Sequence, residues 1–416
     1  MINEGEVDVV RVLIVGVGTR GDVAPYTGLG VRLREAGHEV AVACHQPYAD
    51  LVTTAGLEHR DIPGDLFPLL PVGKGGARVS PAAKLALFAE YGRQVSGGIV
   101  RAAAAGTDVL LLNVAASAGY HVAEAMGVPS MGVHLQPVEP TGDFPPVMSV
   151  VRRSLGRWGN RTAARLAFAL PSPAHAGSAK ELRAALGLPP IGSREAYRRR
   201  EAACWPVLHG FSPSVLPRPA DWRAGLEVTG YWWPVRPAGW RPDPRLRDFL
   251  DSGPPPPVFV GFGSQAGPRA DHYTDLALHA LRLAGLRGVL QTGVPGTLND
   301  DVLGVADVPH EWLFPRMAAV AHHCGSGTTG AGLRAGVPAV GLPALADQPL
   351  WASRLAALGV GPAAVPFRRL SPERLAAALR AAVSEPSYAR RAAELSERIR
   401  AEDGGAAVVA AVNSLA

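Results

Sequence analysis

Runs of apolar residues that end in glycine recur along the chain and predict the strands of a parallel sheet. The first run, VVRVLIV at residues 9–15, is nearly continuous and rich in β-branched side chains, as in a strand buried on both faces. A glycine-rich turn follows, and then a helical stripe of Tyr26, Leu29 and Leu33 that ends at Gly37. The pattern therefore predicts a strand, a tight turn and an amphipathic helix.

The same alternation continues and indicates βαβ units. Residues 39–43 form a second short strand pattern, a short helix is expected to end near Gly56, and another short strand is expected at about residues 58–62. Strand, helix and strand in this order are typical of a parallel, doubly wound sheet.

The pattern starts again in the second half of the chain, after a stretch dense in Pro and Trp that shows no sustained period. The second half is expected to contain a helix at 271–284 and strands at 257–264, 288–292, 318–323 and 338–343. The predicted organisation is a first domain at 1–215, a linker region at 216–256, a second domain at 257–395 and a helical tail at 396–416. Two such domains leave a cleft between the carboxyl ends of their strands, where α/β sheets bind ligands.

The composition agrees with two or three globular domains and disfavours collagen-like and nucleic-acid-binding proteins. The chain has 416 residues, 47% of them hydrophobic, and its 48 Gly and 38 Pro show no collagen-like period. The net charge is +5, and all but three of the 41 basic residues are arginines scattered along the chain, which disfavours a nucleic-acid binder. Three separated cysteines without a C-x-x-C motif, and no apolar run of about 18 residues, favour a cytoplasmic protein.

The first turn, GVGTRG at residues 16–21, satisfies the G-x-G-x-x-G pattern of dinucleotide-binding domains. That pattern also requires an acidic residue at the end of the second strand to bind a ribose, whereas this strand ends Ala43, Cys44, His45. Asp22 directly follows the third glycine, where it would repel a pyrophosphate. Both features disfavour dinucleotide binding.

The segment HHCGSGTTGAG, residues 322–332, follows a predicted strand and opens a helix. Small side chains at 325–329 leave backbone N–H groups free at the helix N-terminus, which together with the helix dipole favours an anion. His323 adds a donor, and the G-K-[ST] of a P-loop does not follow. An ordinary strand-to-helix turn is the alternative.

Asp347 and Gln348 follow the predicted strand at 338–343 and belong to the same rim of the sheet. A carboxylate beside an amide offers the acceptors and donors that bind vicinal hydroxyl groups. The alternative, which the segment alone favours, is that Asp347 is a helix N-cap.

Together these segments resemble the GT-B glycosyltransferases, in particular the family 1 branch of sterol glucosyltransferases and bacterial antibiotic glycosyltransferases. The resemblance covers essentially the whole chain, in the family's order. The matching segments are GTRGDVAPY (18–26), HLQPVEPTGDFP (134–145), VTGYWW (228–233), GFGS (261–264), VPHEWLFPR (308–316), HHCGSGTT (322–329) and ADQP (346–349). The implied fold is two doubly wound, Rossmann-like parallel-sheet domains facing a central cleft.

The resemblance implies that the second domain binds a nucleotide-diphosphate sugar and that the first binds an acceptor. The implied diphosphate-binding residues are Ser264, His323, Gly325, Ser326, Gly327 and Thr328. The implied base-binding residues are Val308, His310 and Trp312, and the sugar-binding residues are Asp347 and Gln348. In the acceptor-side loop, the expected acceptor-binding residues are Gln136, Phe144 and Met148.

Many relatives carry a catalytic His in the first loop, where this sequence has Asp22, as sterol and glycopeptide-type members do. We therefore expect Asp22 to take the acceptor proton, late in the reaction because a carboxylate of ordinary pKa, about 3.9, is a weak base. His134, His310 and His322 are alternative bases, although a lone loop histidine is more often structural. The sequence contains no D-x-D motif, so we expect no metal ion to be required.

Residues 147–170 carry Arg153, Arg157, Arg161 and Arg165 at i, i+4 spacing. This spacing is typical of the solvated face of a surface helix, and the alternative is a peripheral contact with an anionic membrane.

The expected function is inverting, metal-independent transfer of a hexose from a UDP- or dTDP-sugar to a hydroxyl of a hydrophobic small molecule, such as a polyketide or macrolide. No cofactor beyond the nucleotide sugar is expected. The alternatives are a sterol or lipid glucosyltransferase, a nucleotide-sugar epimerase, and a non-catalytic helper of the same fold. The sequence leaves the sugar, the acceptor and the choice between monomer and homodimer open.

Overall fold

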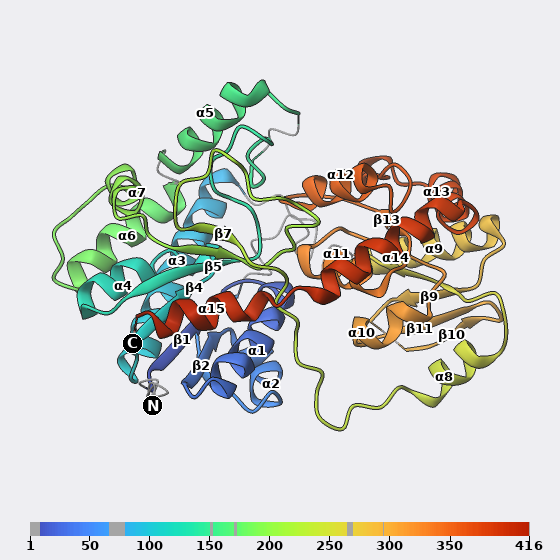
Figure 1. Ribbon diagram of the computed structural model, residues 1–416, viewed down its shortest axis with the longest axis horizontal. Helices are drawn as coiled ribbons and strands as arrows, with labels where there is room; N and C mark the ends of the chain where they lie inside the picture. The colour runs from blue at the N-terminus through green and yellow to red at the C-terminus, as the bar shows by residue number, and fades with distance from the viewer. Residues whose placement is uncertain are drawn as a thin grey trace, which may run out of the picture.

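The computed structural model shows two α/β domains, each built around a sheet that is wholly or mainly parallel (Figure 1). It describes residues 9–65, 80–149, 153–169, 173–263, 269–293 and 295–415. The predicted fold class is confirmed. No helix in these ranges is long and apolar enough to cross a membrane.

The first domain contains a seven-stranded sheet in the order β3-β2-β1-β4-β5-β6-β7, with all neighbours parallel. Its strands are β1 (Arg11–Val15), β2 (Glu39–Cys44), β3 (Glu58–Asp61), β4 (Val109–Leu112), β5 (Ser130–His134), β6 (Val207–His209) and β7 (Leu226–Val228). Its helices are α1 (Arg20–Glu35), α2 (Ala49–Thr53), α3 (Pro81–Ala104), α4 (Gly119–Met126), α5 (Gly156–Ala169), α6 (Pro173–Ala185) and α7 (Ser193–Ala202).

Alternate residues of β1 belong to different cores, because successive side chains of a strand point to opposite faces of the sheet. Val12 and Ile14 are buried in a cluster with the apolar stripe of α1. Leu13 and Val15 are buried in another cluster with α3 and α4. The continuous apolar run therefore marks a strand covered by helices on both sides, as predicted.

The second domain contains a six-stranded sheet in the order β10-β11-β9-β8-β12-β13, in which only the edge strand β10 is antiparallel. Its strands are β8 (Val258–Gly261), β9 (Gly288–Gln291), β10 (Gly296–Asn299), β11 (Val302–Val305), β12 (Ala319–His322) and β13 (Ala339–Gly341). The helices of this half are α8 (Pro244–Asp251), α9 (Ala270–Ala284), α10 (His310–Leu313), α11 (Ser326–Ala335), α12 (Gln348–Leu358), α13 (Pro372–Ser384) and α14 (Pro386–Ala401).

The segment expected as a linker, residues 216–256, contributes to both domains. Its strand β7 pairs with β6 at the edge of the first sheet, and its helix α8 contacts β11 of the second domain. A strand of three residues is too short to show a period of two, which is why the sequence pattern did not reveal it.

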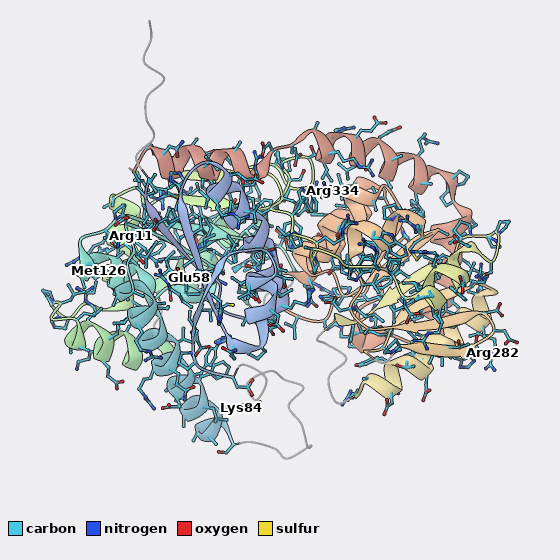
Figure 2. All side chains as sticks on the ribbon, turned by 90° about the horizontal axis from the view of Figure 1, so that it is seen from below. Arg11, Glu58, Lys84, Met126, Arg282 and Arg334 are labelled. Atoms are coloured by element: carbon cyan, nitrogen blue, oxygen red, sulfur yellow. The ribbon has the colours of Figure 1, made fainter. Side chains whose placement is uncertain are left out.

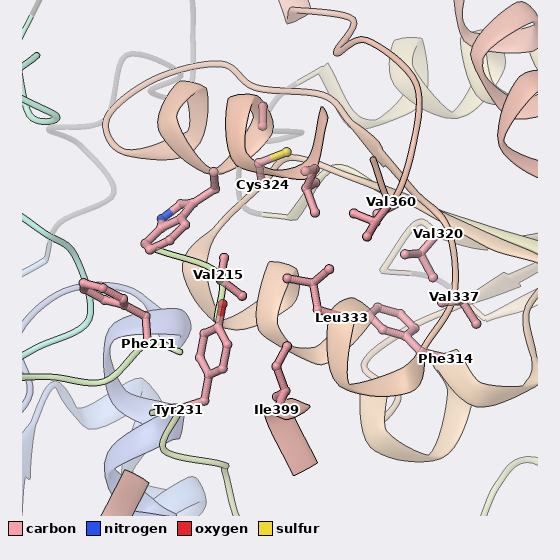
Figure 3. Close-up of a cluster of buried hydrophobic side chains, with 14 of the residues drawn as sticks. Phe211, Val215, Tyr231, Phe314, Val320, Cys324, Leu333, Val337, Val360 and Ile399 are labelled. Carbon is pink, nitrogen blue, oxygen red and sulfur yellow. The ribbon is translucent and has the colours of Figure 1, made fainter. Parts of the chain in front are cut away.

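One apolar cluster continues from the second domain into the first (Figure 3). Phe211 and Val215, which follow β6, belong to the same buried cluster as Phe314 and Leu333. The ring of Phe211 meets that of Trp351 on α12 edge to face, with centroids 5.4 Å apart. The two domains are therefore joined by packed side chains as well as by the chain itself.

The last helices cross from the second domain back to the first (Figures 1 and 2). Helix α14 packs on α11, and after Glu402 and Asp403 the helix α15 (Gly404–Asn413) packs on α1. Val408 and Val412 of α15 are fully buried in the core of the first domain. The boundary predicted at residue 396 falls inside α14, so the helical tail begins at Pro386 and ends on the other domain.

Helix α1 approaches the chain after β7 so closely that residue 28 must be glycine. A Cβ atom at Gly28 would overlap the carbonyl oxygen of Trp233. We expect Gly28→Ala to destabilise the protein by about 1–3 kcal/mol, since the backbone must shift to remove the overlap. In the matched control Gly21→Ala on the same helix, the nearest atom to the new Cβ is Thr19 Oγ1 at 3.8 Å.

The measurement is chemical denaturation of both variants and the wild type. The control should be neutral or more stable by a few tenths of a kcal/mol, because alanine is the better helix former. Equal stability of the two variants would contradict the close approach.

Candidate active site

The first side of the site is the start of α1, where a capping box holds Asp22. The backbone N–H and the hydroxyl of Thr19 both donate to Asp22 Oδ2, at 2.9 and 3.0 Å. Gly18 has φ +139°, and a Cβ there would overlap the Asp22 carboxylate. The glycine of the predicted turn is therefore needed to make room for this carboxylate.

The other oxygen of Asp22 connects it to the end of β5. Gln136 Nε2 donates to Asp22 Oδ1 at 3.3 Å. Burial raises the pKa of Asp22, and the hydrogen bonds from Thr19 and Gln136 oppose that rise. The side chain is only partly buried, so it is an oriented carboxylate that remains accessible.

The second side is the N-terminus of α11, where a tight turn follows β12. Cys324 has φ +63°, a conformation that costs a non-glycine residue energy and is concentrated at functional sites. The N-cap, Gly325, has no side chain to accept a hydrogen bond from Ser326, Gly327 or Thr328. The first N–H groups of a helix have no partner within it, so this end presents donors and a partial positive charge.

The ring of His323 lies beside this helix end, in space left by two glycines. A Cβ at Gly263 would come within 2.5 Å of His323 Cε1, and one at Gly325 within 2.7 Å of His323 Nε2. The buried Nδ1 of His323 has no hydrogen-bond partner in the described part of the chain. Burial lowers the pKa of His323 to about 4, so at neutral pH it offers a neutral N–H donor. Ser264, predicted to bind the diphosphate, lies outside the described residues.

The predicted base-binding residues lie around α10. His310 stacks on Phe314 with centroids 4.3 Å apart, and the ring of Trp312 meets Trp240 and the guanidinium of Arg316. Val308 lines a recess of about 220 Å³ together with Trp240. The segment thus joins the second domain to the chain that leads into α8.

Asp347 is at the N-cap of α12, as the alternative interpretation expected, but its side chain makes no capping bond. Its Oδ2 instead accepts a hydrogen bond of 2.6 Å from Trp351 Nε1. The adjoining Ala346 has φ +53°, another strained position. Gln348 Oε1 accepts from the N–H groups of Ala344 and Leu345, which leaves the amide Nε2 as the donor of this side chain.

The two sides face each other across the domain boundary. Burial raises the pKa of Asp347 to about 6, and the negative charge of Asp22 adds to the rise. Ser326 Oγ donates to Leu135 O at 3.0 Å. A second cross-domain contact is the exposed ion pair of Arg20 and Asp307, at 2.5 Å.

A pocket of about 470 Å³ adjoins Ala346 between the two domains. The loop after β5 lines it with Asp143, Phe144 and Val147, and α12 lines it with Leu350 and Arg354. Of the predicted acceptor residues, Phe144 lies in the pocket wall and Gln136 contacts Asp22, whereas Met148 does not line the pocket and is 60% exposed. In the described residues, no group of three His, Cys, Asp or Glu side chains is placed to hold a metal ion.

Known glycosyltransferases resemble this chain over nearly its whole length. Residues 12–141 match the glycosyltransferase family 28 N-terminal domain, and residues 291–415 match the erythromycin biosynthesis protein CIII-like C-terminal domain. O-mycaminosyltylonolide 6-deoxyallosyltransferase of Streptomyces fradiae is 39% identical over 407 residues, which cover 95% of this chain and 94% of the relative. The chain is a glycosyltransferase of the GT-B family.

Other relatives agree with this assignment. A sterol 3-beta-glucosyltransferase of Arabidopsis thaliana is 30% identical over 96% of this chain and 67% of its own. The solved glycosyltransferase of kitacinnamycin matches with a TM-score of 0.71 at 21% identity. The match covers 98% of this chain and 99% of the solved one. VinC in complex with dTDP has a TM-score of 0.66 at 21% identity, with 98% and 100% covered. The predicted family resemblance is confirmed, and the solved structures support the fold.

Helix α5 of the glycosyltransferase lies on the surface at the rim of the 470 Å³ pocket. Arg153, Arg157 and Arg165 are exposed, as expected for a solvated face, whereas Arg161 is half-buried near Asp221. Trp158 is also exposed, at 82%. The buried Asn160 donates to Gly142 O and accepts from Leu155 N, which attaches the helix to the pocket loop. Leu155, Trp158 and Leu166 are exposed apolar side chains on or next to this helix.

The alternative histidines are less suited than Asp22 to act as the base of the glycosyltransferase. His322 is fully buried and accepts from Cys324 N, and burial lowers its pKa to about 3. His134 is also buried, with a pKa well below its ordinary value. Burial lowers the pKa of His310 to about 4, and its ring is stacked on Phe314.

The sequence pattern did not single out Leu135, whose carbonyl oxygen joins the two domains, nor Arg354, whose Nε donates to Val215 O at the pocket. Both contacts connect residues far apart in the chain, so no local pattern could have indicated them.

The raised pKa of Asp347 predicts a pH-dependent stability. Its pKa is about 6 in the folded glycosyltransferase and 3.8 ordinarily, so folding binds a proton between these values and stability falls as the pH rises through them. We expect Asp347→Asn to gain about 2–3 kcal/mol relative to the wild type between about pH 4 and about pH 7.

Denaturant unfolding at several pH values tests this, with the exposed Asp300→Asn as control. A stability difference between Asp347→Asn and the wild type that does not change with pH would refute the assignment.

Proposed function

We propose that this glycosyltransferase moves a hexose from a UDP- or dTDP-sugar to a hydroxyl group of a hydrophobic small molecule, with inversion and without a metal ion. The observation that carries the proposal is the contact between the two domains at this point: Gln136 bonds to the Asp22 carboxylate, and the adjoining Leu135 bonds to Ser326 at the N-terminus of α11, which favours an anion. The Asp22 carboxylate can act as a base, and the helix N-terminus can stabilise a departing diphosphate.

The donor diphosphate is bound at the N-terminus of α11. The N–H groups of Ser326, Gly327 and Thr328 and the neutral ring of His323 supply donors where negative charge develops. These preorganised dipoles act in place of a metal ion. A thymidine nucleotide is supported by VinC and SsfS6, whose solved structures contain dTDP and thymidine diphosphate.

The hexose lies against α12. Asp347 keeps one carboxylate oxygen beyond its bond to Trp351, and Gln348 keeps its amide donor. An acceptor and a donor side by side match two neighbouring sugar hydroxyls.

The transfer itself is a single displacement. As the acceptor oxygen bonds to the anomeric carbon, the bond from that carbon to the diphosphate oxygen breaks, and the acceptor proton passes to Asp22. Attack opposite the leaving group inverts the anomeric carbon. The raised pKa of Asp22 makes it a better base than an ordinary carboxylate, and its bonds to Thr19 and Gln136 fix its direction.

The acceptor occupies the 470 Å³ pocket, whose size suits a drug-sized molecule. Phe144, Val147 and Leu350 give it apolar walls, and Asp143 and Arg218 give it polar groups at fixed positions. The substrate named for the Streptomyces fradiae relative supports a macrolide acceptor, and the Arabidopsis relative makes a sterol the second candidate.

The test is incubation of the purified chain with UDP- and dTDP-sugars and a panel of macrolactones, polyketides and sterols, with and without EDTA, followed by mass spectrometry. We expect a hexosylated macrolactone or polyketide, unchanged yield with EDTA, and nucleotide release that requires acceptor. An epimerised donor without acceptor would favour an epimerase, and failure to bind any donor would favour a helper protein.

The role of Asp22 gives a second expectation. Asp22→Asn removes the proton acceptor but keeps an oxygen for the Thr19 N–H, so transfer should fall by about 100-fold or more while nucleotide affinity is retained. Asp50→Asn, in the first turn of α2, is the matched control and should be fully active. Turnover of Asp22→Asn near that of the wild type would exclude Asp22 as the base.

A further inference from the structure

Ser326 contacts the opposite domain, although it lies in the predicted diphosphate site. Its hydroxyl donates to the carbonyl oxygen of Leu135 at 3.0 Å, and Ser326 itself is buried. Leu135 is the first residue after β5, in the domain that carries Asp22. The bond therefore connects the two sides of the site.

This bond changes what the Ser326 side chain can do for a bound diphosphate. A hydroxyl can donate only one hydrogen bond, and the Ser326 hydroxyl donates it to Leu135 O. It therefore has no proton left to donate to a phosphate oxygen. The donors that remain at this helix end are the backbone N–H groups and the Thr328 hydroxyl. Anion binding and contact between the domains are thus divided between neighbouring residues of one helical turn.

The contact continues from Leu135 to the base. Gln136 follows Leu135 directly, and its amide reaches Asp22 Oδ1. The start of α11, Ser326, Leu135, Gln136 and Asp22 therefore form one continuous series of bonds.

Two other polar contacts between the domains are placed differently. The ion pair of Arg20 and Asp307 is exposed, so water and salt screen it. The bond from Arg354 to Val215 O lies at the pocket, beyond the anion site. Ser326 differs from both because it is buried and belongs to the turn that would bind the diphosphate.

We propose that Ser326 is a positioning residue that sets Gln136 and Asp22 at a fixed distance from the bound diphosphate, and that its hydroxyl is not a phosphate ligand. This inference rests on the proposed function. When the nucleotide binds to the N–H groups of α11, it fixes the helix end, and Ser326 transmits that position to the base. Transfer is sensitive to such a link because a shift of about 1 Å in a reacting group can cost about 100-fold in rate.

The experiment compares Ser326→Ala with Thr328→Ala, and uses Ser326→Thr as the conservative variant. Calorimetry with dTDP and UDP measures nucleotide affinity, and turnover is measured at saturating donor. For Ser326→Ala we expect affinity within about threefold of the wild type and turnover lower by about 10- to 100-fold. For Thr328→Ala we expect weaker nucleotide binding and a smaller loss of turnover, and Ser326→Thr should restore most of the rate.

Hydrogen exchange supplies a readout that does not need catalysis. Nucleotide binding should slow exchange in residues 130–141 of the wild type, and this protection should be lost in Ser326→Ala although the nucleotide is bound. If the wild type binds nucleotide but transfers no sugar, the proposed function fails and the exchange result still decides the role of Ser326.

Two results would overturn the inference. One is a loss of nucleotide affinity in Ser326→Ala as large as that in Thr328→Ala, which would make the hydroxyl a phosphate ligand. The other is protection of residues 130–141 by nucleotide in Ser326→Ala as strong as in the wild type.

Discussion

The apolar core that the two domains share is the constraint on which the site depends. Neither half of the site is complete alone, because the proposed base, Asp22, belongs to the first domain and the helix proposed to bind the diphosphate, α11, belongs to the second. Phe211 and Trp351 pack against each other inside a cluster that continues into the second domain. Since protein interiors are packed as densely as organic crystals, such a cluster fixes the separation of the domains far more firmly than exposed ion pairs do.

The environment of each carboxylate in the cleft suits a different role. Asp22 receives three hydrogen bonds, from Thr19 and Gln136, which keep it oriented while burial raises its pKa. Asp347 receives one from Trp351 and is more deeply buried. Because the two carboxylates repel each other when both are ionised, one of them binds a proton more readily here than on the open surface. Keeping Asp22 and Asp347 in the site therefore costs some folding stability.

The periodic parts of the fold could be predicted from the sequence. The run at residues 9–15 became β1 at Arg11–Val15, and the helix expected to end at Gly37 ends at Glu35, because buried parallel strands and amphipathic helices leave strong local patterns. The antiparallel strand β10 left no such pattern, because its residues Gly296–Asn299 are mostly exposed at a sheet edge.

The candidate site also has parts that the sequence predicts and parts that it does not. Gly18, Gly263 and Gly325 could be recognised in their glycine-rich turns, where a Cβ atom would overlap Asp22 or His323. The bond between Ser326 and Leu135 could not, since it joins residues 191 positions apart. The partner of Asp347 was also missed, because a cap and a bond to Trp351 have the same sequence signature and differ only in the direction of the side chain.

The crossing of α15 has a consequence for how the chain reaches this structure. The N-terminal domain is synthesised first, yet one apolar face of it is covered by Val408 and Val412, which are synthesised after the whole second domain. That face stays open to water, or to other chains, until the second domain has been synthesised. The first domain therefore cannot complete its core before the second domain has been made. A cut at the domain boundary would leave the N-terminal fragment with an uncovered apolar face that favours aggregation.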